Sequence, residues 1–189
     1  GLPLLLILLF LTACGSSVGR LNQRGNEAFA AQDYPSALEA YRQAQVEAPD
    51  VPEPYYNAAN TYYRQQDYQQ AELQTRQALR HADDALAQRS FYNLGNTYFQ
   101  RGEFQQAVEA YKEALRLNPD DRDAKHNLEL ALQQLQQQQQ QNQQQQDQQQ
   151  QNQQSNQQQQ QDQPQQNQQQ NQQQQNQPQQ NQQQPQQQE

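Results

Sequence analysis

The stretch of sequence that decides the fold runs from Gln88 to Asp121 and reads QRSFYNLGNTYFQRGEFQQAVEAYKEALRLNPDD. Its small residues Gly95, Ala107 and Ala114 are spaced to let two helices approach closely, and its large aromatic residues are spaced to fill the gaps beside them. Pro119 ends the second helix, because proline has no backbone N–H to donate. The stretch therefore predicts a hairpin of two closely packed helices.

The same pattern occurs twice more upstream, with a period of 34 residues. The three units span residues 18–51, 52–85 and 88–121. The first unit carries the equivalent residues Leu21, Gly25, Tyr34, Ala37, Tyr41, Ala44 and Pro49. The second unit departs from the pattern, because it has Thr75 in place of Tyr and Asp83 in place of Pro. Leu86 and Ala87 are inserted before the third unit, so this junction is expected to be the least regular.

The period and the residue positions together resemble the tetratricopeptide repeat (TPR), in which each unit is a helix–turn–helix. The resemblance implies an all-α superhelix of three stacked units. An apolar stripe in residues 122–136 predicts a C-terminal capping helix; its members are Ala124, Leu128, Ala131, Leu132 and Leu135. Asp120 or Asp121 can cap the start of that helix. Three units and a capping helix meet the minimum for a stable solenoid.

The N-terminal segment indicates export. The apolar run from Leu2 to Leu11 is too short to span a bilayer as a helix, and the adjoining Leu11-Thr12-Ala13-Cys14 resembles the lipobox of bacterial lipoproteins. The resemblance implies a signal peptide at residues 1–13, a lipid on Cys14 and a lipid anchor with a short linker at residues 14–20. We therefore expect an extracytoplasmic protein anchored to the bacterial cell membrane by lipid. The alternatives are a transmembrane anchor or an ordinary signal peptide.

The C-terminal part has a different composition. Residues 133–189 hold 42 Gln and 7 Asn, a composition that cannot bury a core. Three prolines and the scattered asparagines argue against one long helix. We expect the capping helix to end near residue 136 and residues 137–189 to form a disordered Gln-rich tail. The tail is then either an unselective spacer or an interaction segment, because Gln and Asn tracts associate through amide ladders.

Charge and residue types exclude several functions. The chain has a formal net charge of −8 and no basic run, so no nucleic-acid partner is expected. His81 and His126 lie in different predicted helices, and the sequence has no Gly-rich phosphate loop and no metal-ligand cluster. We therefore expect that the protein is not an enzyme and binds no metal or cofactor.

In tetratricopeptide arrays the first helix of each unit lines the concave face. Carried over position by position, the resemblance implies a peptide-binding groove of Asn22, Asn26, Tyr56, Asn57, Asn60, Tyr63, Arg64, Arg89, Tyr92, Asn93, Asn96, Phe99 and Asn127. Gln23, Phe29, Glu53, Gln100 and His126 hold neighbouring groove positions. Amides donate and accept at once, so Asn57, Asn93 and Asn127 can hold an extended peptide backbone while the aromatic residues accept its side chains.

Some members of this family grip C-terminal carboxylates with a cluster of Lys and Arg. Asn26, Asn57 and Arg89 fit that carboxylate clamp, but Asn22 and Asn93 stand where two cations would be. The groove residues therefore indicate a protein or peptide partner without identifying it.

A narrower resemblance rests on Tyr92-Asn93-Leu94-Gly95-Asn96, on Asn118-Pro119-Asp120-Asp121 and on the segment from Asp123 to Leu132 that passes into the Gln run. These segments are similar to the tetratricopeptide proteins of bacterial Bat, or aerotolerance, operons. The resemblance implies a scaffold that works with von Willebrand factor A domain membrane proteins and an associated ATPase system. The alternatives are an assembly lipoprotein for secretion, pili or outer-membrane protein insertion, and a regulator of a cell-wall enzyme.

Overall fold

The computed structural model describes the backbone of residues 17–175 and the side chains of residues 17–153. All regular structure within residues 17–175 is α-helical. The chain divides into two compact units at Gln137, and the first of them holds the repeats. Cys14 and the predicted signal peptide lie outside the described residues.

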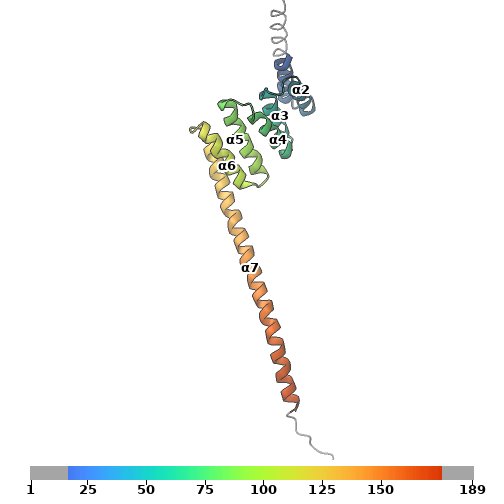
Figure 1. Ribbon diagram of the computed structural model, residues 1–189, viewed down its shortest axis with the longest axis vertical. Coiled ribbons are helices and arrows are strands. Elements are labelled where there is room, and N and C mark those ends of the chain that lie inside the picture. Colours follow the sequence, from blue (N-terminus) through green and yellow to red (C-terminus); the bar gives the residue numbers. More distant parts are fainter. Residues whose placement is uncertain (1–16, 176–189) are drawn as a thin grey trace, which may run out of the picture. The chain divides into compact units, whose positions relative to one another are not determined.

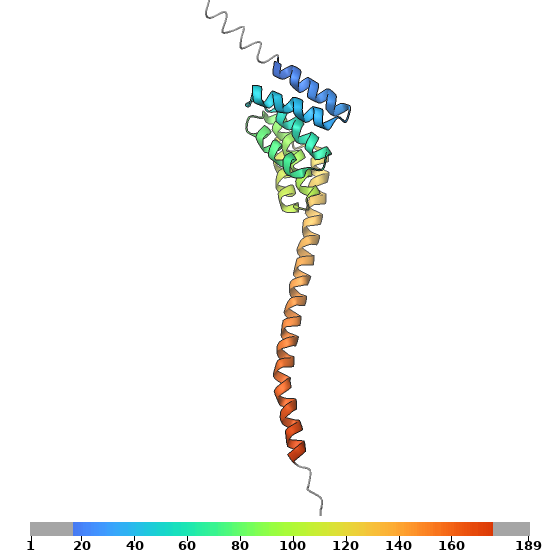
Figure 2. The same ribbon diagram turned by 90° about the vertical axis from the view of Figure 1, so that its right-hand side faces the viewer.

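Six helices follow the helix over residues 17–30 (Figure 1). They are α2 (Tyr34–Glu47), α3 (Glu53–Arg64), α4 (Tyr68–Leu79), α5 (Asp84–Gln100), α6 (Phe104–Leu117) and α7 (Arg122–Gln175). The helix over residues 17–30 lies alongside α2, as Figure 2 shows, and α3 packs on α4 and α5 on α6. The predicted all-α array of three helical hairpins followed by a further helix is therefore confirmed.

Aspartate side chains start four of the helices. Asp33, Asp67 and Asp83 each accept a hydrogen bond from the backbone N–H three residues further on, at the starts of α2, α4 and α5. Asp121, one of the two predicted candidates, accepts from the N–H of Ala124 at the start of α7. These carboxylates satisfy an otherwise unpaired N–H and face the positive end of the helix dipole.

The turn inside each hairpin has the same backbone conformation. Gln32, Gln66 and Gly102 occupy the same repeat position, and their φ angles are 61°, 63° and 73°. Glycine adopts this left-handed conformation without steric cost, whereas a glutamine adopts it against its preference. The three hairpins therefore close in the same way although only one of them has glycine at the turn.

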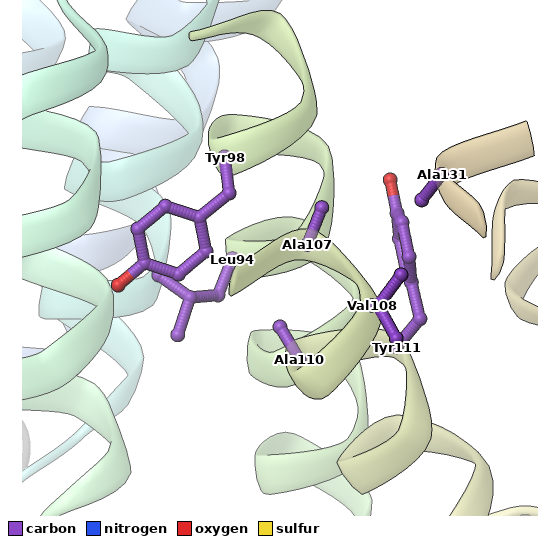
Figure 3. Packing of buried hydrophobic residues seen from close by; sticks show 7 residues of the cluster. All are labelled: Leu94, Tyr98, Ala107, Val108, Ala110, Tyr111 and Ala131. Atoms are coloured by element: carbon purple, nitrogen blue, oxygen red, sulfur yellow. The ribbon is translucent and has the colours of Figure 1, made fainter. Parts of the chain in front are cut away.

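The core of the third unit is a cluster of small residues and aromatic rings. Its buried members are Leu94, Tyr98, Ala107, Val108, Ala110, Tyr111 and Ala131 (Figure 3). Leu94 and Tyr98 point toward the preceding unit, and Tyr111 points toward Ala131 of α7 (Figure 3). Ala124 and Ala131 are completely buried. The start of α7 therefore covers the face that the third unit would otherwise expose, as a capping helix does.

The junction between the second and third units differs from the sequence prediction. Helix α5 begins at Asp84, so Leu86 and Ala87 form part of a helix of 17 residues. Leu86 is buried there. The insertion therefore lengthens the first helix of the third unit at its start instead of interrupting the array.

Two smaller predictions, the extent of the N-terminal linker and the members of the apolar stripe, are also corrected. Residues 17–20 are helical, so the linker predicted for residues 14–20 does not extend to residue 20. Val18 is buried, and the burial of its side chain stabilises this first turn of the helix. Leu132, which was placed in the apolar stripe of α7, is 44% exposed, because the stripe that faces the core runs through Ala124, Leu128 and Ala131.

Helix α7 does not end near residue 136, because it continues to Gln175. Residues 137–175 are therefore helical where the sequence predicted disorder. Every side chain from Gln136 to Gln153 is exposed, so this part of α7 is held by its own backbone hydrogen bonds. Glutamine ranks among the good helix formers, which allows the run to continue a helix that is already packed at its start.

Candidate functional site

A row of asparagine side chains crosses the face formed by the first helix of each unit. Three hydrogen bonds make up this amide row: Asn57 donates to Asn22 (3.0 Å), Asn93 to Asn60 (2.6 Å) and Asn127 to Asn96 (3.0 Å). The bonds join the helix over residues 17–30 to α3, α3 to α5, and α5 to α7. The predicted groove asparagines therefore lie on neighbouring helices and contact one another directly.

The amide row keeps hydrogen-bonding capacity for a ligand. An asparagine side chain has two N–H donors and one accepting oxygen. Asn57 and Asn93 each use one N–H in the row, and within the described residues their second N–H and their Oδ1 have no protein partner. An extended peptide presents N–H and C=O groups in alternation, and side-chain amides at successive units can pair with both.

Tyrosines from the second helices hold two groove asparagines in place. The hydroxyl of Tyr41 donates to Asn26, and the hydroxyl of Tyr111 donates to Asn96, each at 2.8 Å. Both tyrosines are buried, and burial raises the pKa of Tyr41 to about 12. The hydroxyls therefore remain protonated donors at neutral pH, and the core fixes the orientation of these two amides.

Aromatic groove residues are supported by a second ring in every unit. The pairs are Phe29 with Tyr34 (ring centroids 5.9 Å apart), Tyr63 with Tyr68 (5.6 Å) and Phe99 with Phe104 (5.4 Å). The first ring of each pair lies near the end of the first helix, and the second lies at the first residue of the second helix. Such tilted contacts contribute about 0.5–1.5 kcal/mol beyond the area they bury, so the groove rings are held in place.

A pocket of about 310 Å³ is lined by residues of α3, α5, α6 and α7. We call it the aromatic pocket; its lining is Tyr63, Tyr92, Asn96, Phe99, Gln100, Tyr111, Asn127 and Leu130. None of these residues carries a charge at neutral pH. Burial raises the pKa of Tyr63 and of Tyr111, so the surroundings of the pocket disfavour charge.

Positive charge is sparse at the carboxylate-clamp positions. The guanidinium of Arg89 lies over the ring of Tyr56, 5.3 Å from its centroid. Asn22 and Asn93, which stand where two further cations would be, are bonded within the amide row. Arg64 lies exposed in the last turn of α3 and does not line the aromatic pocket. The structure therefore offers one cation at these positions, on a face otherwise made of amides and rings.

Most of the predicted groove residues belong to one of two features, and Asn26, Tyr56, Arg64 and Arg89 belong to neither. The amide row contains Asn22, Asn57, Asn60, Asn93, Asn96 and Asn127, and the aromatic pocket contains Tyr63, Tyr92, Asn96, Phe99 and Asn127. Two lining residues of the pocket were not predicted as groove residues. Tyr111 is one of the aromatic residues of the third unit that were expected to fill the gaps beside its two helices, and Leu130 was placed in neither the apolar stripe nor the groove. Leu130 follows Asn127 by three residues on a helix, which is the signal that would have placed both on one face.

The described part of the chain has neither a membrane-crossing helix nor a metal cluster. Within residues 17–175, no helix combines the length and apolar character that a membrane span requires. In the same range, no three His, Cys, Asp or Glu side chains are grouped so that they could hold a metal ion.

Two family models, both described as tetratricopeptide repeat, match residues 22–85 and 89–121. Together they cover just over half of the sequence. The chain belongs to the tetratricopeptide-repeat family. No curated protein matches this TPR protein.

Solved structures of other TPR domains share its fold. The first TPR of Spaghetti (RPAP3), bound to the HSP90 peptide SRMEEVD, is 22% identical with a TM-score of 0.60, over 64% of this chain and 94% of that one. The second TPR domain of human RPAP3, in complex with the HSP70 peptide SGPTIEEVD, is 22% identical with a TM-score of 0.59, over 62% and 97%. The TPR2B domain of yeast Sti1, in a complex with pHsp70, is 19% identical with a TM-score of 0.59, over 63% and 98%. At these identities the likeness shows the fold alone.

Proposed function

We propose that this TPR protein is a membrane-anchored lipoprotein scaffold whose groove binds a peptide segment or protein partner in the bacterial envelope. The observation that carries the proposal is the amide row, in which three asparagine pairs join successive first helices from Asn22 to Asn127 and retain unpaired donors and acceptors within the described residues. The aromatic pocket lies beside its C-terminal end, because Asn96 and Asn127 belong to both. Together they provide partners for a peptide backbone and a place for a side chain.

Proteins of the same fold support peptide binding as the function. The two RPAP3 TPR domains hold an HSP90 and an HSP70 peptide, and the TPR2B domain of yeast Sti1 is in a complex with pHsp70. This chain has one cation where a carboxylate clamp uses several, so we propose a partner that is not selected by a terminal carboxylate. The amides and rings of the groove favour an internal, largely uncharged segment.

The anchoring part of the proposal rests on the lipobox-like segment that ends at Cys14. Two or three acyl chains on this cysteine would give stable attachment, whereas one chain gives marginal attachment. The variant Cys14→Ala is expected to lose incorporation of labelled fatty acid in a bacterial host. If the Ala variant still incorporates the label, the lipoprotein assignment is wrong.

We further propose that the partners are von Willebrand factor A domain membrane proteins in a Bat-like complex. The support is the resemblance of the third unit, the capping helix and the Gln-rich segment to Bat-operon proteins. Crosslinking in native membranes, followed by purification and mass spectrometry, tests it. Recovery of A-domain membrane proteins supports the complex. Recovery of secretion, pilus or outer-membrane assembly proteins instead indicates an assembly lipoprotein, and recovery of a cell-wall synthase indicates a regulator of that enzyme.

The groove is tested in the same experiment with the double variant Asn57→Ala/Asn93→Ala. We expect loss of partner capture, because both amides are removed from the middle of the row. The matched control is Gln69→Ala/Gln105→Ala, which removes two exposed amides from α4 and α6. Arg89→Gln is a second groove variant. Because Arg89 is exposed, this change should leave the protein folded, so the groove is still tested if the double variant unfolds. Capture that is unchanged in both groove variants would show that the partner binds elsewhere.

A further inference from the structure

The aromatic pocket has a more specific lining than a general peptide groove requires. Four of its eight lining residues are aromatic: Tyr63, Tyr92, Phe99 and Tyr111. The rings of Tyr92 and Tyr111 lie 6.1 Å apart and are tilted by 54°. A volume of about 310 Å³ is at the lower end of the range for ligand sites, so the pocket holds one large side chain and not a whole ligand.

The amide donors of Asn127 inside the aromatic pocket are already used by the protein. Asn127 donates to the oxygen of Asn96 at 3.0 Å and to the hydroxyl of Tyr92 at 3.2 Å, which uses both of its N–H groups. The oxygen of Asn96 accepts from Tyr111 as well. Within the described residues, the Oδ1 of Asn127 has no protein partner. The pocket therefore offers a ligand an acceptor, and the amide of Gln100 stands at its exposed rim.

A charged ligand side chain fits the aromatic pocket poorly. No lining residue provides a counter-ion, and burial raises the pKa of Tyr63 and of Tyr111. A carboxylate or guanidinium would lose its water there without gaining an opposite charge. A neutral ring, in contrast, gains edge-to-face contacts with the rings of the lining beyond the area it buries.

We propose that the aromatic pocket is a specificity site for one aromatic side chain that carries a hydrogen-bond donor, with tryptophan preferred. The indole N–H meets the Oδ1 of Asn127, and the ring packs among the four lining rings. This inference rests on the proposed function, because the side chain belongs to the peptide that the groove binds. It adds which residue of the partner the groove selects.

The test uses the fact that the chain contains no tryptophan, so indole fluorescence reports only the probe. The full-length protein is titrated into acetyl-Gly-Gly-Trp-Gly-Gly-amide, and fluorescence anisotropy is measured. Peptides with Leu, Arg or Ala at the centre are then added as competitors. We expect saturable binding of the Trp peptide, at least tenfold tighter than the Ala and Arg peptides and severalfold tighter than the Leu peptide.

Two variants on one helix locate the binding. Leu130→Lys places a charged side chain at the pocket lining and should weaken binding of the Trp peptide at least tenfold. Leu132→Lys is the matched control, because Leu132 is similarly exposed on α7 and does not line the pocket. Leu130 and Leu132 are 37% and 44% exposed, so neither change removes a buried side chain.

Competition by the Leu or Arg peptide as strong as that of the Trp peptide overturns the aromatic preference. Equal binding by Leu130→Lys and the unchanged chain overturns the assignment to this pocket. The proposed function fails separately. If partner capture depends on Asn57 and Asn93 but no Trp preference is found, the groove function stands and this inference falls. If the Trp peptide binds in the pocket but no partner is captured, the inference stands without the proposed membrane partners.

Discussion

At the scale of single residues, two helix glycines each face a tyrosine ring that leaves no room for a Cβ. A Cβ added at Gly95 would lie 2.4 Å from a ring carbon of Tyr111, and the equivalent glycine of the first unit meets Tyr41 in the same way. At the same positions the second unit has Ala59 and Thr75, both buried. In the second unit, alanine replaces the glycine and the smaller threonine replaces the tyrosine that would meet its methyl group. The two changes compensate each other, which explains why the second unit departs from the pattern.

The variant Gly95→Ala is expected to lower the free energy of unfolding by about 1–2 kcal/mol. Overpacking a core costs about 1–3 kcal/mol, which exceeds the gain of about 1 kcal/mol from replacing a helical glycine by alanine. Urea denaturation followed by far-UV circular dichroism measures the change. Gly19→Ala is the control, because Gly19 is helical and exposed and nothing lies within 4 Å of its added Cβ. The control should raise stability by about 0.5–1 kcal/mol.

The double variant Gly95→Ala/Tyr111→Thr copies the second unit into the third. Its loss of stability should be smaller than the sum of the two single losses by about 1 kcal/mol, because the added methyl group no longer meets a ring. Strictly additive losses would show that the ring contact does not explain the glycine.

At the scale of helices, a partly buried carboxylate joins the second unit to the third. Glu72 on α4 accepts hydrogen bonds from Tyr98 on α5 (2.8 Å) and from Arg76 (2.9 Å), and Arg101 after α5 pairs with its other oxygen. Burial by itself raises the pKa of Glu72, but the bonds from Tyr98, Arg76 and Arg101 outweigh it, so the pKa is held below its usual value. This network lies at the C-terminal end of α5, and the insertion lengthens that helix at its other end.

The variant Glu72→Gln is expected to destabilise the protein by about 2 kcal/mol at pH 7, because charge-assisted hydrogen bonds are lost between two units. The folded pKa of Glu72 lies below the unfolded one, so its contribution is present above about pH 4.5. It is lost as the pH falls through the folded pKa. Urea denaturation at pH 7 and at pH 3 should therefore show the variant and the unchanged chain converging in acid.

Glu39→Gln is the control for this prediction. Within the described residues, the side-chain hydrogen bonds of Glu39 go to Arg42 and Gln43 of its own helix, and Glu39 is half exposed, so its replacement should change stability little at either pH. If Glu72→Gln loses as much stability at pH 3 as at pH 7, the negative charge of Glu72 is not what joins the two units.

At the scale of the whole molecule, the part of α7 up to Gln137 has a different role from the part that follows. Leu128 and Leu135 pack against the core, and Ala124 and Ala131 are completely buried. From Gln136 to Gln153 every side chain is exposed. Stability of the repeats should therefore depend on the first part of the helix alone.

A chain that stops after Gln137 is expected to keep the melting temperature of the full chain, because residues 138–153, the removed side chains that the structure describes, are all exposed. Its helical circular dichroism signal should fall by the contribution of residues 138–175. A chain that stops after Asp121 is the comparison, since it also loses the capping residues and should melt far lower. A full-length spectrum with no additional helix would contradict the extension of α7 to Gln175.

Much of this architecture could be predicted from sequence, because the relevant patterns are local. The order of helices follows from the spacing of small and aromatic residues within single units, and the aspartate caps act over three residues. The asparagines of the amide row stand at repeat positions that can be read from the sequence. The end of α7 could not be predicted in this way, because a Gln run has helical propensity without a buried face to mark where the helix stops.

The spacing of small and aromatic residues is enough to specify a TPR array of three hairpins with a capping helix, and the repeat positions specify which side chains the first helices offer. Helix packing in three dimensions was needed to show which amides pair, that Tyr111 and Leu130 complete the aromatic pocket, and that Glu72 joins two units. These contacts link residues on different units or on the two helices of a hairpin. They depend on how each helix is rotated against the next, and that rotation is set by the packing of whole helices and not by any local pattern.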